Sequence, residues 1–140
     1  MAIESSSAPV GIVGLGSVGL PLAILFARAG VPLVLLERDP ERRRLIEGRT
    51  SPLAHVDDRL IQELGDAVVT GRPADLAGCR AVILCVPTPL DPERRPDLRS
   101  VEAAATEVSE HVAPGCLVVL ESTTWPGTTR EILGGIFEGK

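Results

Sequence analysis

The sequence predicts an α/β fold built around a doubly wound parallel sheet, and two observations carry that prediction. Short runs rich in valine, isoleucine and leucine alternate with segments of helical character along the whole chain. Several of these runs are almost continuously apolar, which is typical of strands covered by helices on both faces. A strand, a helix and a strand in succession imply parallel pairing through right-handed crossovers. We therefore expect one sheet with helices on each side.

The first half of the chain contains four predicted elements. The run Val10–Val13 is the first strand, and the apolar segment Val18–Ala29 is a helix that ends before a glycine. The second strand spans Leu33–Glu37. A helix then starts after Asp39, whose carboxylate is a favourable N-cap in front of a proline, and it runs to Glu47.

The second half continues the alternation. Ser100 is a candidate N-cap for the helix near it, and a Pro-Gly turn at 114–115 returns the chain to a strand. The predicted elements follow the order helix, strand, strand, helix, strand, helix: Asp57–Leu64, Ala67–Val69, Ala81–Val86, Ser100–His111, Leu117–Glu121 and Thr128–Phe137.

Length and charge restrict what the chain can bind. With 140 residues, 44% of them hydrophobic, it has material for one domain, which we assign to residues 9–140 after a flexible tail over residues 1–8. A net charge of −5 leaves no Lys/Arg-dense face, so we expect neither nucleic acid nor a membrane as a partner. No apolar stretch approaches the roughly 18 residues of a membrane span, and the first residues lack the features of a secretory signal. We expect a soluble, cytoplasmic protein.

The three cysteines do not form a recognisable metal or disulfide pattern. Cys79, Cys85 and Cys116 have neither zinc-ligand spacing nor an even number. Cys85 lies inside the run AVILCV and Cys116 begins the run CLVVL. We therefore expect small buried hydrophobic residues rather than reactive thiols, and no metal site.

Residues 14–19, GLGSVG, place three glycines between the first strand and the first helix. In a dinucleotide-binding domain of the Rossmann type, Gly14 would form the tight turn, Gly16 would let the pyrophosphate approach the backbone, and Gly19 would let helix and sheet pack closely. Ser17 and Val18 complete the loop at the helix N-terminus. Glu37 follows at the expected distance of about 20 residues, where its carboxylate would bind the adenosine ribose and repel a 2′-phosphate. The pattern predicts NAD rather than NADP.

Nearby arginines leave open a second possibility, that the cofactor is NADP. Arg38 and the run Arg42–Arg44 follow the acidic residue, and guanidinium groups in this region can accommodate a 2′-phosphate. The interpretation that we favour is that Arg42–Arg44 form the solvated face of a helix. NAD remains the predicted cofactor, and Arg38 is among the residues expected to bind it.

Two further loops are expected at the same edge of the sheet as the glycine-rich turn. They follow the predicted strands Ala81–Val86 and Leu117–Glu121, and open parallel sheets bind ligands at the carboxyl ends of their strands. The simpler alternatives are a rigid Pro-Thr-Pro turn and a Ser-Thr-Thr cap for the last helix. The residues expected to border the cofactor are Val86, Pro87, Thr88, Glu121, Ser122 and Thr123.

Four stretches of the chain together resemble a known family. They are GLGSVGLPLA, LERDPER, CVPTPLDPERRPDL and ESTTWPGTT, spread between Val10 and Leu133. The chain resembles the N-terminal NAD-binding domain of the nucleotide-sugar 6-dehydrogenases, which oxidise C6 of a UDP-sugar to a carboxylate. Its motifs are more similar to the branch that acts on UDP-N-acetylhexosamines than to the branch that acts on UDP-glucose.

The resemblance implies roles for individual residues. The three glycines of the turn would hold the pyrophosphate and Glu37 the adenosine ribose, although Asp is commoner at that position. Thr123 would be catalytic, because the matching threonine of the family helps to position the water used in the reaction. The residues on the nicotinamide side would be Thr88, Glu121 and Thr123.

The family's reaction needs more than the motifs found here. The resemblance implies two successive hydride transfers to NAD, through a thiohemiacetal and a thioester on a cysteine of a helical middle region, in the service of polysaccharide biosynthesis. A C-terminal domain then completes the UDP-sugar site. Neither region has a counterpart in residues 1–140, so we expect this chain alone to be inactive.

Two other functions and the oligomeric state stay open at this point. The chain could be the cofactor domain of a β-hydroxyacid dehydrogenase, whose glycine loop is similar, although the stretch ESTTWPGTT argues against it. It could also be an NAD-binding module without chemistry. Relatives commonly form a homodimer through the middle region, so a homodimer is neither required nor excluded by this sequence.

Overall fold

Five parallel strands form one sheet in the order β3-β2-β1-β4-β5. The computed structural model describes residues 8–138, so the predicted tail over residues 1–8 falls outside the described residues except for its last position. The sheet confirms the predicted fold class, because the strand order steps outward from β1 in both directions. The strands are β1 Val10–Val13, β2 Leu33–Leu36, β3 Val68–Thr70, β4 Ala81–Leu84 and β5 Leu117–Leu120.

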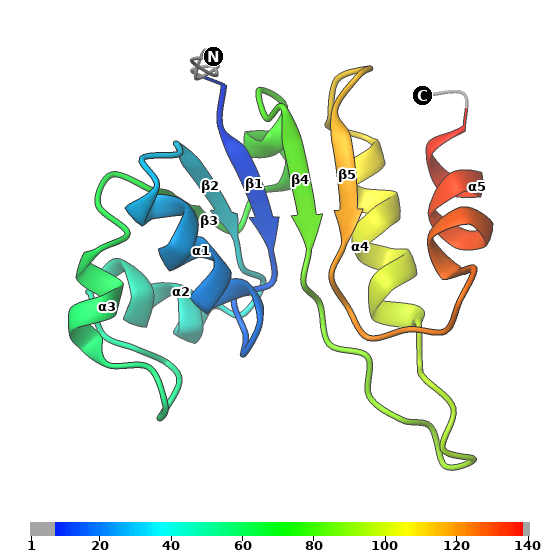
Figure 1. Ribbon diagram of the computed structural model, residues 1–140, viewed down its shortest axis with the longest axis horizontal. Helices are drawn as coiled ribbons and strands as arrows, with labels where there is room; N and C mark the ends of the chain where they lie inside the picture. The colour runs from blue at the N-terminus through cyan, green and yellow to red at the C-terminus, as the bar shows by residue number, and fades with distance from the viewer. Residues whose placement is uncertain (1–7, 139–140) are drawn as a thin grey trace.

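Helices cover both faces of this sheet, as the apolar strands predicted. Figure 1 shows α1, α2 and α3 grouped on one side of the molecule and α4 and α5 on the other. Each group encloses its own cluster of buried side chains, one centred on Ile12 and Leu35, the other on Val82 and Leu84. Within the described part, none of the helices combines the length and the apolarity needed to cross a membrane. Their bounds are α1 Gly19–Arg28, α2 Pro40–Glu47, α3 Asp58–Gln62, α4 Arg99–Ser109 and α5 Gly134–Phe137.

One helix starts as its capping residue predicts, and a second has a cap of the same kind that was not predicted. The Asp39 carboxylate accepts hydrogen bonds from the backbone N–H groups of Glu41, at 2.9 Å, and Arg42, at 3.3 Å, while Pro40 occupies the first helical position. Asp57 caps α3 in the same way, with Arg59 N as the donor. Glu37, the residue after β2, is therefore followed two positions later by the capped start of α2.

The predicted strands are too long at the edge where they end. Glu37, Val86 and Glu121 lie just beyond β2, β4 and β5, and the third strand spans Val68–Thr70 instead of Ala67–Val69. Glu37 N still donates to Thr70 O and Glu121 N to Leu84 O, after which the chain leaves the ladder. The sequence pattern does not mark this departure, because the backbone of the residue after β2 or β5 is still hydrogen-bonded to the neighbouring strand.

Two helix predictions also need correction, and one short helix was not predicted. Ser100 lies inside α4, which begins at Arg99 with Leu98 as its N-cap residue, so the proposed cap is wrong. The predicted helix Thr128–Phe137 is two elements, a π-helical turn η2 over Thr129–Leu133 and then α5. A short 3₁₀ helix, η1 over Pro73–Leu76, was not predicted and contributes the buried side chain of Leu76 to the core.

Candidate functional site

A cavity of about 640 Å³ lies at the edge of the sheet where the strands end. It receives residues from the turn after β1, the loop after β2, the loops after β4 and β5, and one face of α4. Of the predicted cofactor residues, Gly19 is outside the lining. The others all border the cavity: Gly14, Gly16, Ser17, Val18, Glu37, Arg38, Val86, Pro87, Thr88, Glu121, Ser122 and Thr123.

Gly14 and Gly19 are glycines because the protein's own backbone leaves no room for a side chain. Gly14 has a φ of +90°, and a Cβ on it would lie 2.8 Å from the carbonyl oxygen of Cys85. A Cβ on Gly19 would lie 1.8 Å from the carbonyl oxygen of Gly14. The first residue makes the turn and the third brings the start of α1 against it, which are the roles expected of them.

Gly16 differs from both neighbours. Its φ is not in the left-handed region, and of the described atoms only Arg42 Nη1 would come within 4 Å of an added Cβ, at 3.8 Å. Neither backbone conformation nor packing within the protein therefore requires a glycine here. The missing side chain instead leaves open the cavity wall at the N-terminus of α1, where backbone N–H groups are unpaired by the helix itself.

Glu37 has a structural task that the sequence did not suggest. It is 7% exposed, and its Oε2 accepts a hydrogen bond from the backbone N–H of Leu15 at 2.9 Å. Its Oε1 accepts one from Asp39 N at 3.0 Å. The carboxylate thus ties the glycine-rich turn to the end of β2. Each carboxylate oxygen can accept a second hydrogen bond, so capacity remains for hydroxyl groups in the cavity.

The arginine run does not form a uniform solvated face, and that prediction is wrong for two of its three members. Arg42 borders the cavity, with Nη1 3.6 Å from Glu37 Oε2. Arg43 folds back and donates to the carbonyl oxygens of Glu37, at 2.8 Å, and Arg38, at 3.1 Å. Arg44 alone fits the prediction, since it is exposed and pairs with Glu41. A basic residue five positions after the acidic one was the available signal for Arg42.

Hydroxyl groups hold the two further loops together. The Thr88 hydroxyl donates to the backbone carbonyl of Thr123 at 2.8 Å, and the Ser122 hydroxyl donates to that of Val86 at 2.7 Å. Each bond joins residues about 35 positions apart in the chain. The structure therefore brings Thr88 and Thr123 together, whereas the Ser-Thr-Thr segment does not act as a side-chain cap for the helix that follows.

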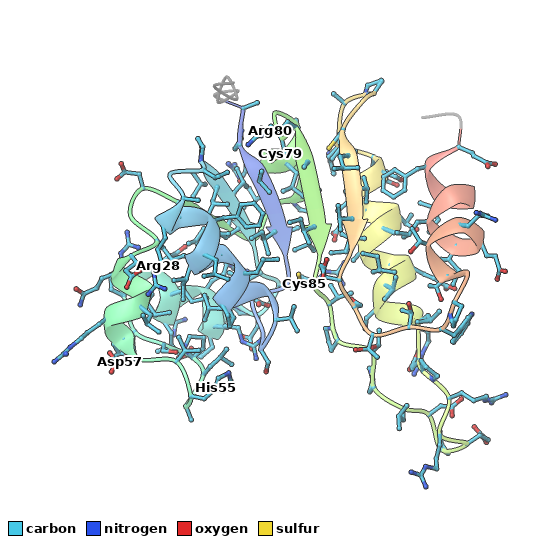
Figure 2. All side chains as sticks on the ribbon, in the orientation of Figure 1. Arg28, His55, Asp57, Cys79, Arg80 and Cys85 are labelled. Atoms are coloured by element: carbon cyan, nitrogen blue, oxygen red, sulfur yellow. The ribbon has the colours of Figure 1, made fainter. Side chains whose placement is uncertain are left out.

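The cysteines are packing residues, with one correction. Cys79 and Cys85 are buried, and Figure 2 labels them at opposite ends of β4, with Cys85 beside the cavity. Burial raises the pKa of each of these two thiols to about 11. Cys116 is only half-buried, so the prediction of full burial is wrong for it, although burial still raises its pKa. Among residues 8–138, no three His, Cys, Asp or Glu side chains are grouped as metal ligands.

The thiol environments predict a labelling pattern. In native protein at pH 8, a thiol-specific disulfide reagent should react with Cys116 first and much more slowly with Cys79 and Cys85, because a thiolate is needed for attack and burial disfavours it. Release of the coloured product over time, before and after unfolding, measures this. Rapid reaction of all three thiols in the native state would contradict the packing described here.

The arrangement suits an extended ligand that carries an anionic group and hydroxyl groups. An open glycine wall at a helix N-terminus receives an anion, a buried carboxylate accepts from hydroxyls, and two tied loops supply hydroxyl and backbone groups at the far end. These three features follow one another along a single edge of the sheet.

Comparison with known families identifies a dinucleotide-binding domain, as the cavity and its glycine-rich turn indicate. Residues 8–140 match the sequence model of the UDP-glucose/GDP-mannose dehydrogenase family, NAD binding domain. The chain is 38% identical to a UDP-N-acetyl-D-mannosamine dehydrogenase of Pyrococcus horikoshii over 93% of its own length and 33% of the relative's. It is 34% identical to a UDP-N-acetyl-D-glucosamine 6-dehydrogenase of Pseudomonas aeruginosa, over 87% of its length and 29% of the relative's. The chain thus spans about a third of the length of these relatives.

Solved structures agree with this match. A UDP-glucose dehydrogenase from the archaeon Pyrobaculum islandicum superposes with a TM-score of 0.86 at 27% identity, over 98% of this chain and 34% of that one.

Proposed function

Because the chain belongs to the UDP-glucose/GDP-mannose dehydrogenase family and matches its NAD-binding domain, we propose that it forms the NAD site of a UDP-sugar 6-dehydrogenase. The substrate that we propose is a UDP-N-acetylhexosamine, with UDP-glucose as the alternative, because relatives named for the former are 38% and 34% identical. Membership of this family sets aside the β-hydroxyacid dehydrogenase. The observation that carries the NAD site is Gly16, which lines the cavity at the N-terminus of α1 and whose Cβ position is open.

The residues present fit NAD along the whole cavity. We propose that Gly16, Ser17 and Val18 receive the pyrophosphate, with the Arg42 guanidinium adding positive charge beside it. Glu37 would use its remaining acceptor capacity for the adenosine ribose hydroxyls. A 2′-phosphate would meet a buried carboxylate there, which favours NAD over NADP.

The nicotinamide end would lie against the two tied loops. Glu121 and Thr123 border the cavity there, and the Thr88 hydroxyl holds the backbone of Thr123 in place. NAD bound in this position supplies an acceptor for the hydride that leaves C6 of the sugar. The contribution of the chain itself is to orient that ring, and we propose that Thr123 also helps to position the water that the reaction consumes.

We further propose that the chain binds NAD without oxidising a sugar on its own. The covalent step of the family's reaction needs a thiolate nucleophile, and both buried thiols of this chain have raised pKa values. The proposed role in polysaccharide precursor synthesis and the cytoplasmic location follow from the substrate class, since NAD and nucleotide sugars share that compartment.

Calorimetric titration with NAD and NADP tests the cofactor proposal. We expect NAD to bind, and NADP to bind at least about tenfold more weakly, because a dianionic phosphate would have to lie beside the Glu37 carboxylate. Incubation of the NAD-loaded chain with UDP-N-acetylglucosamine, UDP-N-acetylmannosamine or UDP-glucose should produce no NADH absorbance. Absent NAD binding or preferential NADP binding would contradict the cofactor assignment, and NADH formation would contradict the incompleteness of the chain.

A further inference from the structure

An ion pair lies at the end of the cavity next to Glu37. Arg38 Nη2 donates to Glu107 Oε2 at 2.8 Å, which joins the loop after β2 to α4, 69 positions further along the chain. The Arg38 side chain is 66% exposed and that of Glu107 is 31% exposed. Exposed pairs of this kind contribute little to the free energy of folding. The stability of the fold therefore does not depend on this ion pair. The position of the Arg38 side chain does depend on it.

One face of α4 borders the same part of the cavity. Ser100 and Ala104 both line it, and Glu107 follows one turn later on the same side of the helix. Ala104 is buried and its side chain is a single methyl group, so this part of the cavity wall is nearly flat. Arg38, which also lines the cavity, faces this stretch of helix through its bond to Glu107.

The position of Glu37 indicates what this part of the cavity receives. If Glu37 binds the adenosine ribose, the pyrophosphate lies on its glycine-rich side and the base lies on its other side. Arg38 directly follows Glu37 in the chain, borders the cavity and is hydrogen-bonded to α4. We propose that Glu107 is a positioning residue that holds the Arg38 guanidinium against the adenine ring of the bound dinucleotide. This inference rests on the proposed NAD site.

The chemistry of the pair fits this role. A guanidinium group is planar and stacks on aromatic rings, while it keeps donors free for a carboxylate at its edge. An arginine with two-thirds of its side chain in solvent otherwise samples many rotamers, and ordering it on binding would reduce affinity. Glu107 favours one arrangement before the base arrives, so part of the entropy of ordering is already lost in the free protein.

Calorimetric titration of Glu107→Gln with NAD tests the proposal, because the direction of the change in NAD affinity separates it from a simple charge effect. Removing a carboxylate near an anionic ligand should by itself strengthen binding. We expect the opposite, an NAD affinity about two- to fivefold weaker, because a neutral glutamine holds the Arg38 guanidinium less firmly and part of its stacking contribution is lost. The melting temperature should stay within about 2 °C of the parent, since the pair is exposed.

A second background separates positioning from a general disturbance. In Arg38→Leu, NAD should bind more weakly than to the parent, and adding Glu107→Gln there should cause no further weakening, because its only target is gone. Glu63→Gln is the matched control: it breaks the exposed Arg28–Glu63 pair between α1 and α3, away from the cavity, and should leave NAD affinity unchanged. Figure 2 labels Arg28 on that side of the molecule.

The outcomes distinguish this inference from the function that it rests on. Weakening in Glu107→Gln that disappears in the Arg38→Leu background supports the positioning role. Unchanged or stronger NAD binding in Glu107→Gln, or equal weakening in both backgrounds, overturns the role while leaving the NAD site intact. Failure of the parent chain to bind NAD overturns both.

Discussion

Gly16→Val is expected to abolish NAD binding while leaving the fold intact. The valine side chain would occupy the part of the cavity where we place the pyrophosphate. It would keep the phosphates away from the N-terminus of α1. We expect an affinity loss on the order of 100-fold or more. Within the protein, the new Cβ would make only an ordinary contact with Arg42, so the melting temperature should change by no more than about 2 °C.

Gly78→Val is the matched control for this variant. Gly78 precedes Cys79 in the turn before β4, and a Cβ there would find none of the described heavy atoms within 4 Å. NAD affinity should be the same as in the parent chain. If Gly16→Val bound NAD normally, the glycine-rich turn could not be the pyrophosphate site, and the assignment of Glu37 to the adenosine ribose would fall with it.

Gly19→Ala is expected to be the most destabilising single methyl group that can be added to the turn. Its Cβ would lie 1.8 Å from the carbonyl oxygen of Gly14, and 3.2 Å from the Cβ of Cys85. Backbone cannot move aside as a flexible side chain can, so the turn and the start of α1 must separate. We expect the free energy of unfolding to fall by about 3 kcal/mol or more. Thermal denaturation should show a melting temperature lowered by roughly 10 °C.

The control for Gly19→Ala is the same substitution where space is open. Gly135 is an exposed position of α5, and a Cβ on it would meet none of the described heavy atoms within 4 Å. Gly135→Ala should be neutral or stabilising by up to about 1 kcal/mol, since alanine has the higher helix propensity. Equal melting temperatures for the two variants would show that the first turn of α1 is less tightly packed than described.

The sequence was informative at several positions where a local rule sets the structure, although the same kind of rule failed for the Ser100 cap. The glycine spacing and the apolar runs predicted the strand edge that carries the cavity, and Asp39 as an N-cap predicted the start of α2. Thr88 and Thr123 were predicted to lie at one edge because parallel strands share it. Each of these inferences needs only neighbouring residues or the direction of the strands.

Contacts between residues far apart in the chain could not be predicted in this way. The bond from Leu15 N to Glu37 requires knowing how far the glycine-rich turn reaches toward the end of β2. Arg43 belongs to a run of three like charges, yet it binds two carbonyl oxygens that become available only because the chain leaves β2 at Glu37. Arg42 and Arg44 differ only in which side of α2 they occupy, and the cavity lies on one of those sides.

The outer strand of the sheet has a consequence for handling this protein. Among residues 8–138, β5 pairs with β4 alone, so its other side presents a row of open backbone groups. Leu117 is 61% exposed on it, and the next three residues are only half-covered. Such an edge invites strand-to-strand aggregation, which the net charge of −5 opposes by mutual repulsion. Added salt screens that repulsion, so the solubility of the chain should be greatest in buffers of low ionic strength.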